Sequence, residues 1–375
     1  MPKNRDSGLI WASITLVMAV MVLCGVGLVI LNSAGAGKSE LHSILLQQIK
    51  FMCVAVAALL AAAFVNLQTL KKLAIPIAVV SLLVLAAVLI PSIGKEVNGS
   101  RRWLDFGIAS VQPSDFAKIS LVILLSAYLH ENQRKIDGFI DGIFKPFVII
   151  GAFCSLIILE PDFGTTALCG AVGVALMFLS GCNKKILLGF FAAAVSAVSV
   201  AVYFDPVRRA RVLSFMDIEN TKLEGSYQLY QAILGFGVGG VKGAGVGQGR
   251  QQLSFLPEAH TDFIFAIVGE ELGMVVTVLV VLMFAAIFFS AVWSLRRSQN
   301  KFEFFMAAGS AFMIVFQAIF NLCVVTGLMP TKGISLPFIS YGGSNLVAMF
   351  AFVGIILNCM RNWNRPTKIR VVEYE

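Results

Sequence analysis

The sequence predicts an all-α membrane protein, a polytopic bundle of about ten transmembrane helices with both termini cytoplasmic. Of its 375 residues, 58% are hydrophobic and only 13% are charged, and the mean hydropathy is +0.85. Soluble domains carry about 25% charged residues, so this composition excludes an ordinary soluble fold. Apolar runs of about 20 residues, the length that crosses a bilayer as a helix, recur along the whole chain.

Ten such runs are separated by polar connections. They cover residues 9–31, 44–66, 73–93, 114–130, 143–159, 163–181, 185–204, 262–293, 303–328 and 341–360. The first run is too long for the apolar part of a signal peptide and has no convincing cleavage site, so we expect a retained span. Residues 1–375 then form a single membrane domain, in which residues 205–261 are a large extracytoplasmic loop before the eighth span.

Basic residues divide unevenly between the two sides of this predicted bundle. Both termini and every second connection carry most of the Lys and Arg residues, a pattern that marks the cytoplasmic side. The connections at residues 95–113, 205–261 and 329–340 therefore face outward. The same clusters account for the net charge of +8, so we expect no nucleic-acid partner.

Two arginines in the first long outer connection are not needed for topology. Arg101 and Arg102 precede the span that begins near residue 114. Adjacent guanidinium groups can bind a diphosphate through paired hydrogen bonds, or they can bind lipid headgroups. Lys118 lies about one turn inside that span, where a charge either serves function or pairs with a buried carboxylate.

Two carboxylates lie in the tight outer turn between the fifth and sixth predicted spans. Glu160 and Asp162 flank Pro161 in the sequence LEPDFG. They are either solvated caps of the next helix or partners of Lys118, of the arginines or of a divalent cation.

Asp262 marks the point where the long outer loop turns into an apolar helix. A carboxylate at such a membrane edge stays in contact with water, while the reduced dielectric alters its basicity and strengthens its interactions. Asp262 therefore suits a general base, although an acidic residue near a helix start can also act as a cap. Farther along this span, Glu270 and Glu271 require polar partners.

Glycines are concentrated just before this span, in the segment GFGVGGVKGAGVGQG at residues 235–249. They allow the backbone to approach another backbone or a ligand closely. A short amphipathic helix at the interface is expected just ahead of them, at residues 226–235. Gly269 and Gly273 form a small-xxx-small pair that lets a span pack closely on another helix.

The last outer connection, residues 326–345, adds Lys332 and the run Ser340, Tyr341, Gly342, Gly343 at a helix start. Backbone N–H groups at such a start can receive an anion, to which Lys332 would add a positive charge. The run is equally typical of an N-cap with a glycine-assisted turn.

Together these stretches resemble the SEDS family of shape, elongation, division and sporulation proteins. GSRRWLDFG with QPSDFAK, EPDFGT, PEAHTDFIFA and LPFISYGGS occur in that order, and the resemblance covers nearly the whole chain. EAHTDFIFAIVGEELG is more similar to the division branch than to the elongation branch, and the sporulation branch is a further alternative. SEDS proteins are ten-span polymerases of bacterial peptidoglycan.

The resemblance implies a glycosyltransferase of the inner membrane that joins lipid II units at the division septum and releases undecaprenyl diphosphate. It further implies a class B penicillin-binding protein transpeptidase and other divisome membrane proteins as partners. Asp262 matches the family's essential aspartate. The family also has cationic positions, which are matched here by Arg101, Arg102, Lys118 and Lys332. The resemblance makes these residues candidates to stabilise the departing diphosphate, with or without Mg²⁺ or Mn²⁺.

No nucleotide is required by this reaction, because the leaving group is already on the lipid. Some division members carry an acidic residue where this chain has Ser254, so a mechanism using a second carboxylate there is not expected. Two alternatives remain open: a lipid II flippase, whose polar path would use buried charges such as Lys118 and Glu270, and a scaffold for the transpeptidase.

Overall fold

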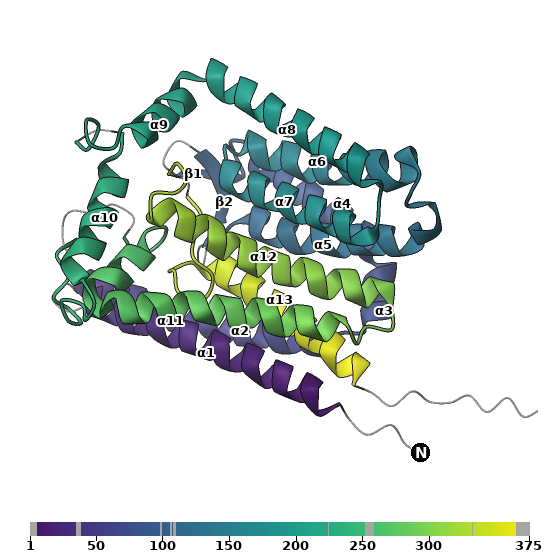
Figure 1. The fold of residues 1–375 in the computed structure, drawn as a ribbon, viewed down its shortest axis with the longest axis horizontal. Coiled ribbons are helices and arrows are strands. Elements are labelled where there is room, and N and C mark those ends of the chain that lie inside the picture. Colours follow the sequence, from purple (N-terminus) through teal and green to yellow (C-terminus); the bar gives the residue numbers. More distant parts are fainter. Residues whose placement is uncertain are drawn as a thin grey trace, which may run out of the picture.

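The computed structural model describes residues 6–34, 39–97, 100–105, 107, 110–223, 225–251, 259–331 and 333–364. These residues form long helices packed side by side, with shorter helices and a small sheet at one end (Figure 1). The helices are α1 (Ser7–Ala34), α2 (Ser39–Phe64), α3 (Leu67–Lys72), α4 (Ala74–Val88), α5 (Pro113–Glu131), α6 (Lys145–Leu159), α7 (Phe163–Ser180), α8 (Lys184–Phe204), α9 (Pro206–Met216), α10 (Tyr227–Gly239), α11 (Ile264–Leu295), α12 (Lys301–Val325) and α13 (Gly343–Trp363).

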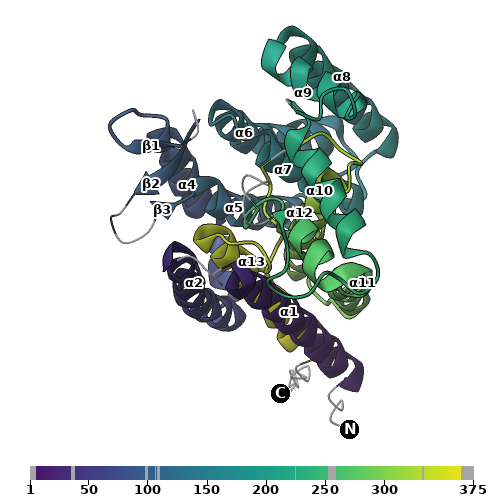
Figure 2. The same cartoon turned by 90° about the vertical axis from the view of Figure 1, so that its left-hand side faces the viewer.

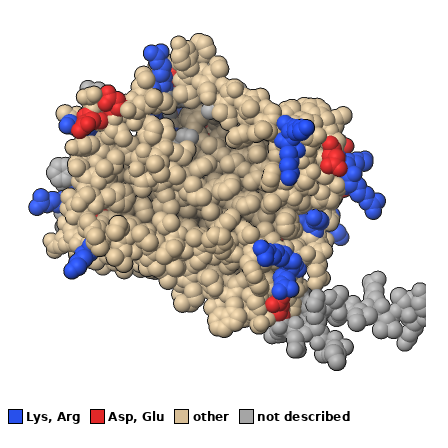
Figure 3. All heavy atoms as spheres, in the orientation of Figure 1, with Lys and Arg blue, Asp and Glu red and all other residues tan. Residues whose placement is uncertain are grey.

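The predicted helical membrane fold is confirmed. Seven helices of the described chain are long and apolar enough to cross a membrane, and Ala74–Val88 is a shorter apolar helix. Each of the ten predicted runs is occupied by a helix, while the count of ten spans stays a prediction. Figure 3 shows a broad uncharged band between charged residues at the two ends, as expected for a surface in contact with lipid.

Helices α12 and α13 form the centre of the bundle. Their most apolar 18-residue windows are 67% and 78% buried inside the protein, whereas that of α2 is only 11% buried. Figure 2 shows α12 and α13 between α1 and α2 on one side and α4 to α7 on the other. The outer helices therefore present apolar side chains to lipid, and the polar groups of α12 and α13 must find partners within the protein.

Both ends of the described chain lie on the same side of the bundle. The backbone N–H of Asp6 donates to Oδ1 of Asn364 at 2.7 Å, and the carboxylate of Asp6 pairs with Arg297 at 3.1 Å. This agrees with the orientation predicted from the basic residues, which places the two termini together.

A small antiparallel sheet lies at the opposite end, in the connection between α4 and α5 (Figures 1 and 2). Its strands are β1 (Gly94–Val97), β2 (Ser100–Asp105) and β3 (Ser110–Val111), in that order. The sequence predicted helices alone, so this sheet is an addition to the predicted fold class. It matters for the site because β2 carries both Arg101 and Arg102.

Candidate functional site

Three connections meet at this outer end of the bundle. They are the turn between α6 and α7, the segment that leads into α11, and the loop between α12 and α13. A Cβ built on Gly164, just after the turn, would lie 2.5 Å from the side chain of Ile334 in the α12–α13 loop. The same loop meets the α11 segment, because the N–H of Tyr341 donates to the carbonyl of His260 at 2.9 Å.

Asp262 lies in the second of these connections, immediately before α11. Its side chain is partly exposed, and a Cβ built on Gly333 would lie 3.1 Å from its Oδ2 atom. The N-cap of α11 is Phe263, and no side-chain hydrogen bond caps the helix there. The structure thus places a carboxylate at the membrane edge, against the backbone of the α12–α13 loop.

The end of the α12–α13 loop is held rigidly by hydrogen bonds. The Ser340 hydroxyl donates to the carbonyl of Thr261 at 2.6 Å and accepts from the N–H of Leu336 at 2.7 Å. The N–H of Gly342 donates to Oε1 of Gln48 at 3.4 Å. At the start of α13, a Cβ on Gly343 would lie 2.8 Å from the ring of Phe51. The predicted anion-binding role of Ser340, Gly342 and Gly343 stays a prediction.

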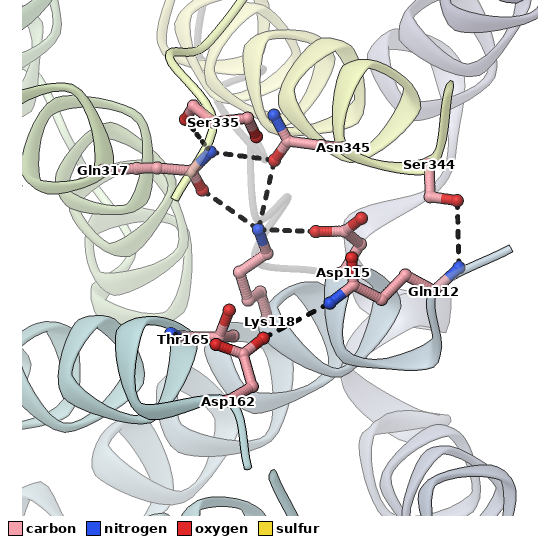
Figure 4. A network of polar contacts seen from close by, with 9 residues as sticks. All are labelled: Gln112, Asp115, Lys118, Asp162, Thr165, Gln317, Ser335, Ser344 and Asn345. Atoms are coloured by element: carbon pink, nitrogen blue, oxygen red, sulfur yellow. Dashed lines mark hydrogen bonds and ion pairs between the residues drawn. The ribbon is translucent and has the colours of Figure 1, made fainter. Parts of the chain in front are cut away.

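Lys118 is the centre of a buried polar network (Figure 4). Its ammonium group lies 2.8 Å from Oδ1 of Asp115, and it donates to Oε1 of Gln317 at 3.0 Å and to Oδ1 of Asn345 at 3.2 Å. Gln317 in turn donates to the carbonyl of Ser335 at 2.9 Å. The three N–H donors of Lys118 thus have three acceptors, and the network ends at the α12–α13 loop.

The two arginines of β2 have different partners, because neighbouring residues of a strand point to opposite faces. Arg101 pairs with Glu96 at 3.2 Å near the surface. Arg102 donates to the carbonyl of Glu160 at 2.8 Å and to that of Pro161 at 3.1 Å. Arg102 therefore joins the sheet to the turn between α6 and α7, and the two guanidinium groups do not form one clamp in this structure.

The turn contains a buried carboxyl group with no hydrogen-bond partner. Glu160 is fully buried, and neither of its carboxyl oxygens has a partner within the described residues. Burial, and secondarily the charge of nearby Asp162, raises the pKa of Glu160 to about 8. Asp162 itself caps α7 by accepting from the N–H of Thr165 at 3.0 Å, as the sequence allowed.

The glycine-rich segment packs closely against a break in α11 and is hydrogen-bonded to it. Gly273 leaves helical geometry at φ 75°, and its neighbour Met274 donates to the carbonyl of Gly240 at 2.9 Å. In return, the N–H groups of Ala244 and Gly245 donate to the carbonyls of Glu270 and Glu271 at 2.8 and 3.0 Å. The expected close backbone approach is therefore present.

The carboxylates of Glu270 and Glu271 also bind this segment and the two residues that follow it. Glu270 accepts from the N–H groups of Arg250 and Gln251 at 2.8 and 3.2 Å. Glu271 accepts from the N–H of Gly247 at 3.2 Å and from the Ser33 hydroxyl at 2.5 Å. These are the partners that two acids inside a span require. They tie the segment preceding Asp262 to the helix that follows it.

Two residues of the predicted outer loops, Lys332 and Ser254, lie outside the described residues. Within the described ranges, no group of three or more His, Cys, Asp and Glu side chains is placed to hold a metal ion.

An apolar groove of about 530 Å³ opens between α4 and α5 and reaches the sheet. Its polar lining is limited to Ser81 and Ser120, so it suits a hydrocarbon chain rather than a headgroup. The lining residues are Leu73, Pro76, Ile77, Val80, Ser81, Val84, Leu104, Val111, Pro113, Phe116, Ile119 and Ser120.

Two buried amides of α12, Gln317 and Asn321, are not among the residues predicted from sequence. Both are 1% exposed, and both bind carbonyls of the α12–α13 loop. Their four-residue spacing within an apolar run was a signal, because it places two polar side chains on one face of a span.

The sequence of the chain is similar to those of known proteins. A family profile described as cell cycle protein, FtsW/RodA/SpoVE, matches residues 9–365. The chain is 34% identical over 364 residues to a probable peptidoglycan glycosyltransferase FtsW of Pseudomonas fluorescens, covering 95% of this chain and 89% of that protein. It is 36% identical over 290 residues to a probable peptidoglycan glycosyltransferase FtsW of Legionella pneumophila, covering 76% and 74% of the two chains.

The fold is also similar to that of solved structures. One similar chain comes from a peptidoglycan synthase complex described as coordinating polymerization and crosslinking. Its TM-score is 0.78 at 27% identity, covering 93% of this chain and 97% of that one. The rod shape determining protein RodA of Thermus thermophilus is similar with a TM-score of 0.67 at 25% identity, covering 92% and 96%.

Proposed function

The chain belongs to the FtsW/RodA/SpoVE family of cell cycle proteins, and we propose that it polymerises lipid II into glycan strands at the outer face of the cytoplasmic membrane. It is a peptidoglycan glycosyltransferase, the activity in the names of its relatives in Pseudomonas fluorescens and Legionella pneumophila. Since those relatives are FtsW proteins, the proposed role is septal cell-wall synthesis during division.

The observation that carries the proposed mechanism is the position of Asp262. Its partly exposed carboxylate lies at the outer edge of the bundle, against Gly333. The flanking backbone is held by hydrogen bonds from Ser340 to Thr261 and from Asn321 to Asp262 itself. A base held in this way needs little reorganisation when it takes a proton.

In the proposed reaction, Asp262 removes the proton of the acceptor sugar hydroxyl, whose oxygen attacks the anomeric carbon of the donor. The bond between that carbon and the diphosphate oxygen breaks, and undecaprenyl diphosphate leaves with the electron pair. One glycosidic bond forms, one phosphoester bond breaks, and the proton resides on Asp262 until water accepts it.

The leaving diphosphate requires positive charge nearby. Arg101 is a candidate for this role, because its ion pair with Glu96 is at the surface and a diphosphate can replace that carboxylate. We assign Arg102, Lys118, Lys332 and Glu160 to the same substrate-binding region. A divalent cation carried by the diphosphate would add charge there, and no nucleotide is needed.

Partner proteins follow from the same family context. The similar chain from a peptidoglycan synthase complex supports a transpeptidase partner that crosslinks the new strand. We propose a class B penicillin-binding protein in this position, within a larger set of division membrane proteins.

The test is glycan synthesis from purified lipid II by the full chain reconstituted with its transpeptidase. Asp262→Asn should abolish polymer formation, whereas Asp217→Asn, which alters an exposed acid of the same outer loop, should leave it unchanged. Equal polymer from Asp262→Asn and wild type would remove Asp262 as the base. Lipid II translocation without polymer from wild type would instead favour a flippase, and cell-division activity retained by Asp262→Asn would favour a scaffold.

A further inference from the structure

Two amide side chains on one face of α12 hold the loop that lies against Asp262. Gln317 and Asn321 are four residues apart, so both project toward the same side of the helix. Gln317 donates to the carbonyl of Ser335 at 2.9 Å, and Asn321 donates to the carbonyl of Ile334 at 2.7 Å. Consecutive residues of the α12–α13 loop are thus bound to consecutive turns of a central helix.

Asn321 makes a second bond, which reaches the proposed base. Its Nδ2 group also donates to the backbone carbonyl of Asp262 at 2.7 Å. Both acceptors are carbonyls, which cannot donate, so the amide nitrogen and not the oxygen must face them. One buried side chain therefore joins the backbone of Asp262 to the backbone of Ile334.

The consequence for the carboxylate follows from Gly333, the residue before Ile334. A Cβ at Gly333 would lie 3.1 Å from Oδ2 of Asp262, closer than most real Cβ contacts. The carboxylate thus occupies space that a side chain at Gly333 would take. Its position depends on how far the α12–α13 loop stands from residue 262, a separation that Asn321 sets together with the bond from Ser340 to Thr261.

We propose that Asn321 is a positioning residue for the glycosyltransferase reaction, acting through the backbone of Asp262 and of the α12–α13 loop. It does not touch the reacting atoms. A general base must lie within hydrogen-bond reach of the hydroxyl that it deprotonates, and a displacement of about 1 Å can lower the rate about 100-fold. This inference rests on the proposed function, with Asp262 as the base.

The chain offers a matched control in Asn358 of α13. Asn358 is also 1% exposed, and its Nδ2 group donates to two carbonyls, of Ala62 and Val65, both at 2.8 Å. It lies near the end of α2 and of α13 that is far from Asp262. Asn358→Leu therefore removes an equivalent pair of donated bonds, together with a longer bond accepted from Arg361 at 3.4 Å, without altering the surroundings of the base.

The experiment compares Asn321→Leu with Asn358→Leu in the full chain reconstituted with its transpeptidase. Thermal unfolding, kcat and KM for lipid II are measured at a temperature where both variants are folded. We expect similar losses of thermal stability, a kcat about 100-fold lower for Asn321→Leu with KM changed less than about 3-fold, and a kcat for Asn358→Leu within about 3-fold of wild type. Equal kcat losses in both variants would overturn the proposal, as would wild-type kcat in Asn321→Leu.

Gly333→Ala provides a second variant that does not depend on the folding of Asn321→Leu. The new Cβ pushes the Asp262 carboxylate by a few tenths of an ångström, so we expect kcat to fall roughly 3- to 10-fold with KM retained. Unchanged kcat in Gly333→Ala would contradict the inference. Activity in Asp262→Asn would refute the proposed base, whereas an inactive Asp262→Asn beside a fully active Asn321→Leu would refute only the positioning role.

Discussion

Replacing Lys118 with Met should be among the most destabilising single substitutions in the bundle. The Lys118 side chain is 3% exposed and that of Asp115 is 7% exposed, so neither charge is in contact with bulk water. Met fills a similar volume but donates no hydrogen bond. It would leave the Asp115 carboxylate and the amide oxygens of Gln317 and Asn345 without their shared donor.

The expected loss in the free energy of unfolding can be estimated by comparing buried and exposed ion pairs. Removing one partner of a buried pair costs about 3–5 kcal/mol, because an uncompensated charge is left behind. Removing an exposed partner costs about 0–1 kcal/mol. Lys145 supplies the exposed case, since it pairs with Asp141 at 2.6 Å and its side chain is 52% exposed. Lys145→Met should therefore be nearly neutral.

The assay is reversible unfolding of the purified chain in mixed micelles, followed by tryptophan fluorescence as the denaturing detergent increases. The double variant Asp115→Leu/Lys118→Met removes both charges, so it should be more stable than Lys118→Met by about 2 kcal/mol or more. Equal free energies of unfolding for Lys118→Met and Lys145→Met would refute this reasoning. The reasoning would also be refuted if the double variant lost as much free energy of unfolding as Asp115→Leu and Lys118→Met lose together.

Two further predictions concern pH and backbone geometry. The pKa of Glu160 is raised to about 8 from 4.5, so the folded protein keeps a proton that the unfolded chain releases, and stability should fall as pH rises across this window. Glu160→Gln should flatten that slope in thermal unfolding measured at several pH values, and an unchanged slope would exclude Glu160 as its source. Gly243 has φ +81°, and a Cβ there would lie 2.3 Å from the carbonyl oxygen of Glu271. Gly243→Ala should therefore lower the free energy of unfolding by about 2 kcal/mol or more. The control is Gly237→Ala in α10, where a Cβ would meet open space, so this variant should be neutral or stabilised by up to about 1 kcal/mol. Similar free energies of unfolding for the two variants would contradict the close packing of Gly243 against α11.

The features predicted correctly from sequence are those that the bilayer imposes on any chain. Hydrocarbon requires long apolar helices, and basic residues record which side stays in the cytoplasm. These rules located the helices, put both termini together and placed Asp262 where an outer loop meets α11. They also showed that Lys118, Glu270 and Glu271 need partners, because a charge inside a span is costly when it is alone.

The identity of those partners was decided only by the tertiary structure. Lys118 pairs with Asp115 three residues earlier in the same helix, but its other acceptors, Gln317 and Asn345, lie on helices far away in the sequence. The two carboxylates of α11 bind backbone N–H groups at the end of the glycine-rich segment and just after it, which no side-chain pattern reveals.

Strand geometry points Arg101 and Arg102 to opposite faces, and long-range packing then brings the turn between α6 and α7 to Arg102 alone. It also brought Asn321 to the carbonyl of Asp262, across 59 residues of sequence. Local sequence determines what each segment can be in a membrane. Which buried polar groups meet depends on how the helices pack, because each must find a donor or acceptor that water would otherwise supply.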